Sequence, residues 1–402
     1  MSSSKIIDKM YFLSILLLVS VFWAFLDMVS LLLLVQLLFF GVAGIKILLK
    51  KRVELSCSPY IRWAFIWIFF CLLTTYWSGN VESTISYTIS VVQVLLVGVL
   101  LVMSIEGKKQ MMQLEQIIII AGIVLVTRLL IVTPSSSWGQ ERLGIEMGMH
   151  VNHIALNLLI SLMFTLKVAI GQKKKLYWPL VVIFLTVLVM TASKKAIIIG
   201  ILALLVALPL GKKGVIKKAK YLLIMLALIA VLIKIAMNIP IIYDLAAERM
   251  EGFISLITNT GIVDESTTER QHLIQTAWKV FLDNPLLGVG LDGFRSYNTE
   301  NAYAHSNFLE ILADCGILGF VIYYSLYFIV LKKFFGRYKQ STIYGVYVMI
   351  ITFILILEIT QVTYYYESVQ FVLAVLFLQT INSNEVNNVI LPSHVILRKK
   401  MT

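Results

Sequence analysis

Long apolar stretches separated by short polar segments run along almost the whole chain. An apolar run of about 17–25 residues can cross a bilayer as a helix. We therefore predict an all-α polytopic membrane protein with about twelve spans. Asp27 divides the first two apolar runs, and Ser193, Lys194 and Lys195 divide a later pair. The predicted spans are residues 11–26, 28–49, 60–76, 84–104, 115–133, 152–171, 176–192, 195–211, 221–240, 306–331, 342–358 and 368–381.

Basic residues fall in every second segment between these runs. Lys5 and Lys9 precede the first run, and later clusters lie at 50–52, 108–109, 173–175, 212–220, 332–339 and 398–400. Since lysine and arginine collect in cytoplasmic loops, both termini are predicted to be cytoplasmic. This topology accounts for the net charge of +12. A nucleic-acid partner is not expected, because it would need a basic face on a soluble module.

Composition supports the same class. Hydrophobic residues make up 59% of the 402 residues and charged residues only 14%, whereas soluble domains carry roughly 25% charged residues. The surface of the protein is therefore expected to face lipid. The protein is predicted to lie in the cytoplasmic membrane, where the lipid bilayer is one of its partners.

One predicted outer segment, residues 241–305, is much longer than the other loops. Loops of this length are usually functional. The predicted organisation is an N-terminal group of about nine spans over 1–240, this extracytoplasmic loop over 241–305, about three C-terminal spans over 306–381, and a cytoplasmic tail over 382–402.

Within the long loop, residues 268–283 show the apolar spacing of an amphipathic helix that lies at the membrane surface. Arg270 falls on its apolar face, and two interpretations stay open: the side chain snorkels or forms a structural ion pair, or it binds substrate. Residues 283–294 follow with a proline and three glycines, which predict a re-entrant turn that shapes a pocket. The apolar positions of the helix are Ile274, Ala277, Trp278, Phe281 and Leu282.

His305 precedes the tenth predicted span, where Ser306 or Asn307 can cap the helix. The positive end of the helix dipole favours a neutral imidazole, which can accept a proton. A capping or interfacial histidine is the alternative. Glu310 and Asp314 follow within the first turns. Because ionisable groups at membrane depth cost roughly 2.5–3.5 kcal/mol each, we expect both to face a water-filled cavity.

Several basic side chains fall on the predicted outer side, where such residues are rare. If they converge on one polar site, they would suit a multiply charged anion such as a pyrophosphate. Interfacial anchoring is the alternative for the two lysines. These residues are Arg142, Lys194, Lys195, Arg270 and His305.

The stretch from Arg270 to Gly319 resembles the signature domain of the O-antigen ligase and O-antigen polymerase family, with the signature region at about 268–330. The similarity rests on Arg270, Trp278, Asp283-Asn284-Pro285-Leu286-Leu287-Gly288-Val289-Gly290, His305-Ser306-Asn307, Glu310 and Gly316-Ile317-Leu318-Gly319. Upstream, Arg142 and Asn152 look like the family's arginine and asparagine, and Thr191 to Ala196 is similar to its Ser-Arg-Gly segment. Lys194 stands where arginine is usual, which keeps the charge but loses bidentate phosphate binding.

The resemblance implies a GT-C-like membrane enzyme that moves a glycan from an undecaprenyl-pyrophosphate carrier to an acceptor hydroxyl outside the membrane. It implies no cofactor, neither metal nor nucleotide sugar. His305 would be the general base, and Arg270 and Arg142 would hold the pyrophosphate. Lys194, Lys195, Asn152 and Glu310 would help to bind substrate. A flippase and a chain-length regulator are possible protein partners.

Three functions remain open at this point. The leading one is a polymerase that joins lipid-linked repeat units into capsular or O-antigen polysaccharide. A ligase that moves finished polymer to a terminal acceptor uses the same chemistry. A transporter or flippase is the third, although transporters usually concentrate polar residues near the midplane, where this chain is largely apolar.

Overall fold

The computed structural model describes residues 3–49, 58–137, 142–210 and 265–381, with a few isolated positions between 214 and 223. Within these ranges, helices form where the apolar pattern predicts them. These residues form helices joined by turns and contain no strand. The main helices are α1 (Ser3–Ala24), α2 (Val29–Leu48), α3 (Pro59–Leu73), α4 (Val81–Ser104), α5 (Gly107–Val132), α6 (Val151–Leu166), α7 (Trp178–Met190), α8 (Lys194–Leu210), α11 (Glu265–Asp283), α12 (Asn307–Arg337), α13 (Thr342–Glu358) and α14 (Glu367–Thr380).

Several of these helices can span a bilayer, so this is a multi-pass membrane protein. Within the described ranges, seven segments are long and apolar enough: Lys5–Ala24, Val29–Leu48, Pro59–Tyr76, Val81–Ser104, Gly107–Val132, Val151–Gly171 and Asn307–Arg337. Lys175–Met190, Thr342–Glu358 and Glu367–Thr380 are apolar but shorter. The expected number of about twelve is not confirmed, and the expected span at 221–240 lies outside the described residues.

Both expected divisions between adjacent apolar runs are confirmed. α1 ends at Ala24 and α2 begins at Val29. α7 ends at Met190 and α8 begins at Lys194. At the first division, Arg128 of α5 donates to both carboxylate oxygens of Asp27, each at 2.7 Å. This pair ties the end of α5 to the turn between α1 and α2.

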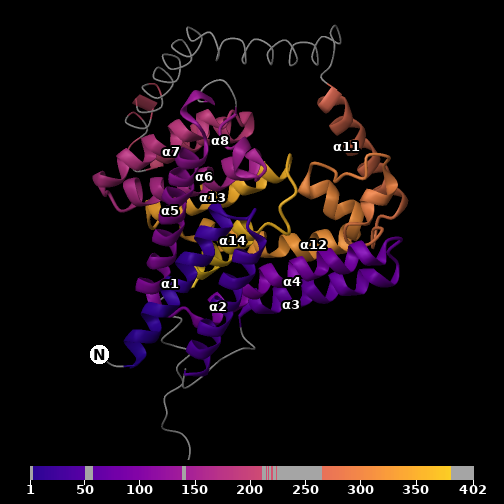
Figure 1. The fold of residues 1–402 in the computed structure, drawn as a ribbon, viewed down its shortest axis with the longest axis horizontal. Coiled ribbons are helices and arrows are strands. Elements are labelled where there is room, and N and C mark those ends of the chain that lie inside the picture. The colour runs from indigo at the N-terminus through magenta and orange to yellow at the C-terminus, as the bar shows by residue number, and fades with distance from the viewer. Residues whose placement is uncertain are drawn as a thin grey trace, which may run out of the picture.

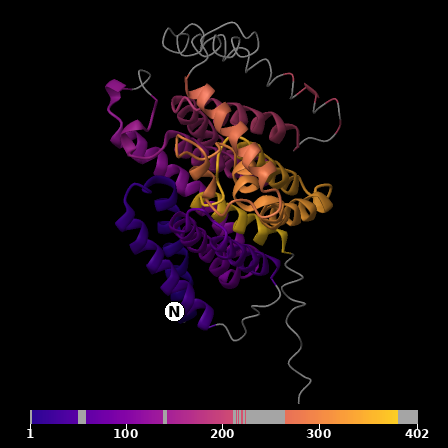
Figure 2. The ribbon, with the colours of Figure 1, turned by 90° about the vertical axis from the view of Figure 1, so that its right-hand side faces the viewer.

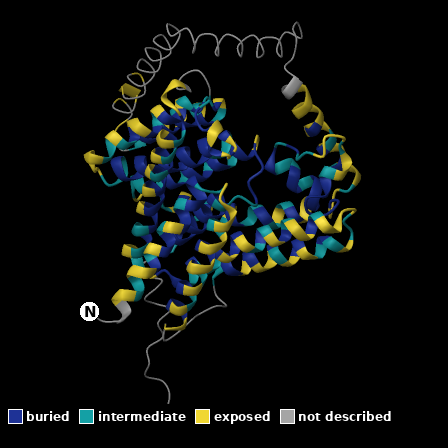
Figure 3. Cartoon of the chain, viewed as in Figure 1, coloured by how far each residue is buried: buried dark blue, intermediate teal, exposed yellow. Residues whose placement is uncertain are grey.

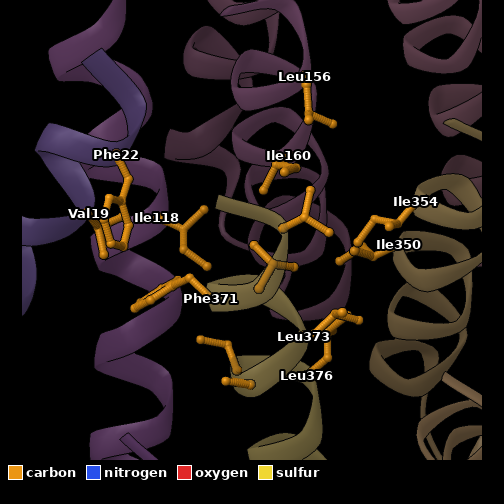
Figure 4. Close-up of a cluster of buried hydrophobic side chains, with 14 of the residues drawn as sticks. Val19, Phe22, Ile118, Leu156, Ile160, Ile350, Ile354, Phe371, Leu373 and Leu376 are labelled. Atoms are coloured by element: carbon orange, nitrogen blue, oxygen red, sulfur yellow. The ribbon is translucent and has the colours of Figure 1, made fainter. Parts of the chain in front are cut away.

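Two helices lie at the centre of the bundle. α6 contacts α1, α5, α7, α8 and α13, and α14 contacts α1, α4, α5, α12 and α13. Figure 1 shows α3 and α4 lying side by side along one side of this core, and Figure 2 gives the view turned by 90°. Apolar side chains from five helices meet around α14, as Figure 4 shows for Val19, Phe22, Ile118, Leu156, Ile160, Ile350, Ile354, Phe371, Leu373 and Leu376.

Apolar side chains also cover the outside of the bundle. In Figure 3, exposed positions follow the outward faces of α3 and α4, while buried positions gather where helices face one another. Leu34 and Leu37 of α2 are 66% and 68% exposed, and Phe65 and Phe69 of α3 are each 62% exposed. Because nothing in water would favour such a surface, these faces are suited to lipid tails.

The segment after α11 folds back onto α12 through backbone hydrogen bonds. The N–H groups of Val289 and Gly290 donate to the carbonyls of Ala313 and Asp314 at 3.0 and 2.8 Å. Farther along, the Ile317 N–H donates to the Pro285 carbonyl at 2.9 Å. The expected turn at 283–294 is thus present, and it packs against α12.

This pairing requires glycine on both sides. A Cβ at Gly288 would lie 2.3 Å from the carbonyl carbon of Asp314, and one at Gly316 would lie 2.4 Å from that of Leu286. Both glycines have positive φ, 67° and 60°, a region that other residues rarely adopt. Gly316 also breaks the helical backbone of α12. The span expected at 306–331 is thus present, as two helical pieces joined at a kink.

The amphipathic helix expected at 268–283 is confirmed as α11, which runs steeply across the direction of α3, α4 and α12 in Figure 1. Its apolar positions divide into two strips. Leu273, Ala277 and Val280 are buried against the turn and α12. Ile274 and Trp278, on the other strip, are 38% and 48% exposed.

Candidate functional site

His305 lies in a tight turn immediately before α12. Its φ of 55° is in the left-handed region, which is uncommon for residues other than glycine and often marks a functional position. Ser306 caps α12 by accepting a hydrogen bond from the Leu309 N–H at 3.5 Å. The ring of Tyr303 packs against the imidazole, with 4.4 Å between the ring centroids. The turn therefore holds the His305 side chain in one place.

Two carboxylates of α12 accept hydrogen bonds from backbone N–H groups of this region. Glu310 accepts a hydrogen bond from the Ala304 N–H at 2.5 Å. Asp314 accepts from the N–H groups of Asp292 and Phe294, each at 2.8 Å. Glu310 and Asp314 are only 1% and 0% exposed, so the expectation that they face a water-filled cavity is wrong. Backbone N–H groups satisfy these buried carboxylates in place of water.

Positive groups from distant parts of the chain act on His305. Burial, followed by the charges of Arg270, Lys195 and His150, lowers the pKa of His305 from 6.5 to about 4. Charges act on a pKa most strongly at short range, so each of these groups lies within electrostatic range of the His305 imidazole. The His305 imidazole is consequently neutral at neutral pH and able to accept a proton.

Arg142 is fixed at the junction of α6, α7 and α8. Its Nε donates to the Thr191 carbonyl at 3.2 Å, and its Nη2 approaches the side-chain oxygen of Asn152 at 3.4 Å. That oxygen also accepts from Ser193 Oγ at 3.1 Å. Asn152 thus connects the segment that carries Arg142 with the segment that carries Ser193. In the sequence, only the family pattern linked these segments.

His150 was given no role from the sequence, and the structure places it beside the same cations. It caps α6: its Nδ1 accepts from the Asn152 N–H at 3.2 Å. A neutral imidazole that accepts at Nδ1 carries its proton on Nε2, which makes the outer edge a donor. Burial, then Arg142, Lys195 and Arg270, lower the pKa of His150. The available signal was its place directly before a predicted span.

The two lysines at the start of α8 are in different surroundings. Lys195 is partly buried, and its Nζ donates to the Thr360 carbonyl at 3.1 Å. Its charge is one of those that lower the pKa of His305. Lys194 is exposed. The structure therefore groups Lys195 with the other cations, whereas the family pattern had drawn attention to Lys194.

A short loop between α13 and α14, residues 359–366, connects these parts. Asn307 is fully buried, and its side-chain oxygen accepts from the N–H groups of Thr363 and Tyr364 at 2.8 and 3.0 Å. The Tyr366 ring lies 4.6 Å from that of His153 in the first turn of α6. Together with the contact from Lys195, the loop touches α6, α8 and the start of α12.

The resulting arrangement is a neutral imidazole next to several fixed positive groups. We use the name cation cluster for the positive side chains of Arg142, Lys195 and Arg270 together with the neutral imidazoles of His150 and His305; α11 supplies Arg270, which is exposed. The cluster can bind an anion and accept a proton beside it. Over the described ranges, no group of three or more His, Cys, Asp or Glu side chains is placed to hold a metal ion.

Residues 179–324 match the family model described as O-antigen ligase. The matched segment contains Lys195, Arg270, His305 and Glu310, whereas Arg142 precedes it. The comparison with curated proteins finds no match. The resemblance seen in the sequence is thereby confirmed over residues 179–324, the segment that is similar to the O-antigen ligase family.

Proposed function

We propose that this protein polymerises oligosaccharide repeat units carried on undecaprenyl pyrophosphate, by glycosyl transfer on the outer side of the cytoplasmic membrane. Members of the O-antigen ligase family are glycosyltransferase-like enzymes of ligase or polymerase type. The observation that supports the proposal most is the neutral His305 imidazole beside Arg270 and Lys195. Such a site matches a reaction that needs a base for a sugar hydroxyl and cations for a departing pyrophosphate.

In the proposed step, the acceptor hydroxyl oxygen attacks the anomeric carbon of the donor sugar. His305 takes the hydroxyl proton as the new glycosidic bond forms. The bond between that carbon and the pyrophosphate oxygen breaks, and its electron pair leaves with the carrier lipid. Arg270, Arg142 and Lys195 stabilise the charge that builds on the pyrophosphate. His150 donates its Nε2 proton in a hydrogen bond to the same anion, without transferring it.

Asn152 and Glu310 act on the substrates through their neighbours in this proposal. Asn152 holds Arg142 and Ser193 in position. Glu310 holds the Ala304 N–H and so the turn that carries His305. Lys194, exposed at the start of α8, supplies a further positive charge at the edge of the site.

The experiment compares cells that carry His305→Ala with cells that carry His272→Ala. His272 is a matched control because it is an exposed histidine on α11, 3.5 Å from the Glu300 carboxylate. Loss of a general base costs about 10²–10⁴-fold in rate. We expect His305→Ala cells to accumulate single repeat units, whereas His272→Ala cells keep the normal ladder of glycan sizes.

The glycan ladder also separates the alternatives. Long chains that stay on the carrier lipid in the His305→Ala strain would indicate a ligase. A normal ladder in that strain would remove His305 from the mechanism. With purified protein in liposomes, movement of lipid-linked substrate without any new glycosidic bond would indicate a transporter.

A further inference from the structure

An open hollow lies at one end of α4, away from the cation cluster in sequence. It has a volume of about 290 Å³ and is lined by Asn80, Glu82, Ser83, Ser86 and Tyr87. Small-molecule sites typically occupy about 300–1,000 Å³, so this hollow, just below that range, has room for a small ligand only. Its floor is formed by the first turns of α4, and neither the family pattern nor the proposed reaction assigns it a role.

The lining indicates the chemical class of that ligand. A carboxylate, an amide and two hydroxyls supply hydrogen-bond donors and acceptors close together, and the Tyr87 ring adds a flat apolar surface. The Glu82 carboxylate would repel a phosphate. Sugars combine many hydroxyls with apolar C–H faces and carry no necessary charge. The hollow is therefore suited to a saccharide rather than to an anion or a lipid tail.

One wall of the hollow is held in place by the turn after α11. Ser83 Oγ donates to the Asp292 carboxylate at 2.5 Å, and Arg295 Nε donates to the same carboxylate at 2.7 Å. Arg295 Nη2 also donates to the Tyr87 hydroxyl at 2.8 Å. Asp292 is only 1% exposed, which makes this a buried and well-partnered link.

The same arginine connects the hollow with the proposed base. The Arg295 guanidinium lies 5.4 Å from the centre of the Tyr87 ring and 5.6 Å from that of Tyr303. The Tyr303 ring in turn lies 4.4 Å from that of His305. Only two side chains thus separate the hollow from the imidazole. A sugar chain seated in the hollow could extend past Tyr303 and present a hydroxyl to His305.

We propose that the hollow formed by Asn80, Glu82, Ser83, Ser86 and Tyr87 binds saccharide residues of the acceptor glycan and directs its reacting hydroxyl toward His305. The proposal rests on the glycosyl-transfer function given above. It gives the two substrates separate places: the donor pyrophosphate lies on the cation cluster from α6, α8 and α11, and the acceptor enters over α4.

The test uses purified full-length protein in liposomes, with the repeat-unit oligosaccharide released from its carrier lipid as the probe. Binding of this free glycan is measured directly, and its inhibition of transfer is measured separately. Ser86→Trp fills the hollow, and Glu82→Gln removes only a charge. Ile85→Trp is the matched control, because Ile85 is an exposed α4 residue outside the lining.

We expect Ser86→Trp and Glu82→Gln to weaken glycan binding and inhibition by roughly ten-fold or more, while Ile85→Trp changes neither. Inhibition by undecaprenyl pyrophosphate should stay unchanged in all three variants. Unaltered glycan binding in the conservative Glu82→Gln variant and in Ser86→Trp would overturn the proposal. If the wild-type protein binds glycan through the hollow but forms no glycosidic bond, the proposed function fails and the saccharide site stands.

Discussion

The titration of His305 gives a direct measure of whether the cation cluster exists in solution. Burial and the neighbouring charges lower its pKa from 6.5 to about 4, with Arg270 the first of those charges. Replacing Arg270 by glutamine removes one positive charge and keeps a polar side chain. The pKa of His305 should then rise but stay below 6.5, because burial, the largest cause, remains.

The size of this effect can be bounded from the same numbers. The pKa of His305 falls by about 2.5, the difference between 6.5 and about 4, and burial accounts for the largest share. One removed charge should therefore move the midpoint of activity loss upward by about one pH unit or less. Independently, the plateau rate should fall, since the variant lacks a pyrophosphate contact.

The assay is the initial rate of glycan formation in liposomes between about pH 3.5 and pH 8. Wild-type activity should be flat near neutrality and fall as pH approaches 4, where His305 becomes protonated. Lys279→Gln is the matched control, because Lys279 is an exposed cation on the same helix. An Arg270→Gln variant with a lower plateau but an unmoved midpoint would refute the proximity of Arg270 to His305.

The lowered pKa of His305 also has a consequence for stability. Between pH 6.5 and about 4 the unfolded chain binds a proton at this histidine and the folded protein does not. The folded state is therefore most favoured above pH 6.5 and loses stability as the pH falls toward 4. His305→Gln should lose less stability over this interval than the wild type, as measured by thermal unfolding in detergent.

Three further predictions concern the architecture around the base. Gly316→Ala should lower the free energy of unfolding by several kcal/mol and so reduce the amount of folded protein, because its Cβ would lie 2.4 Å from a backbone carbon. Gly336→Ala is the control and should be tolerated, because nothing lies within 4 Å of the added Cβ. Asn307→Ala should lower the melting temperature and the rate together, since about 2–6 kcal/mol is lost when two backbone N–H groups are left unpaired. His150→Asn keeps a helix cap but removes the Nε2 donor, so kcat/KM should fall about ten-fold at an unchanged melting temperature; a normal kcat/KM would exclude His150 from the site.

Sequence patterns were most informative where structure is local. The apolar spacing placed α11 at 268–283 against the observed Glu265–Asp283, and it placed the division between α7 and α8 correctly. These features depend on a few neighbouring residues and on the period of a helix. The same reasoning could not tell which apolar positions of this helix meet α12: Leu273, Ala277 and Val280 do so, whereas Ile274 and Trp278 are exposed.

The site itself depends on contacts between distant segments, which a single sequence does not specify. Nothing local indicated that Lys195 would reach the carbonyl of Thr360, or that Asn307 would accept from Thr363. The surroundings of the two buried carboxylates were also predicted incorrectly from the sequence. An ionisable residue at membrane depth must be satisfied, but backbone N–H groups can satisfy it as well as water can. The Glu310 carboxylate is satisfied by a backbone group, the Ala304 N–H.

Several of the family-like residues between Asp283 and Gly319 build the contact between the 283–294 turn and α12. Gly316 opens the α12 backbone, and Gly288 lets the preceding turn lie against it. The pairing brings Asp314 to the N–H groups of Asp292 and Phe294. Asp292 in turn fixes Arg295, which lies over Tyr303 beside the imidazole.

This chain of contacts predicts how substitutions at a distance should act. Asp314→Asn keeps the size of the side chain but replaces one acceptor oxygen by an NH2 group. One of the two hydrogen bonds from the 283–294 turn is then lost, which leaves a buried N–H unpaired at a cost of about 1–3 kcal/mol. Because Asp314 is fully buried, the variant should lower kcat through a displaced His305 while donor binding to the cation cluster persists. The measurement is kcat together with inhibition by undecaprenyl pyrophosphate. A variant with wild-type kcat would show that the 283–294 turn does not position the His305 base.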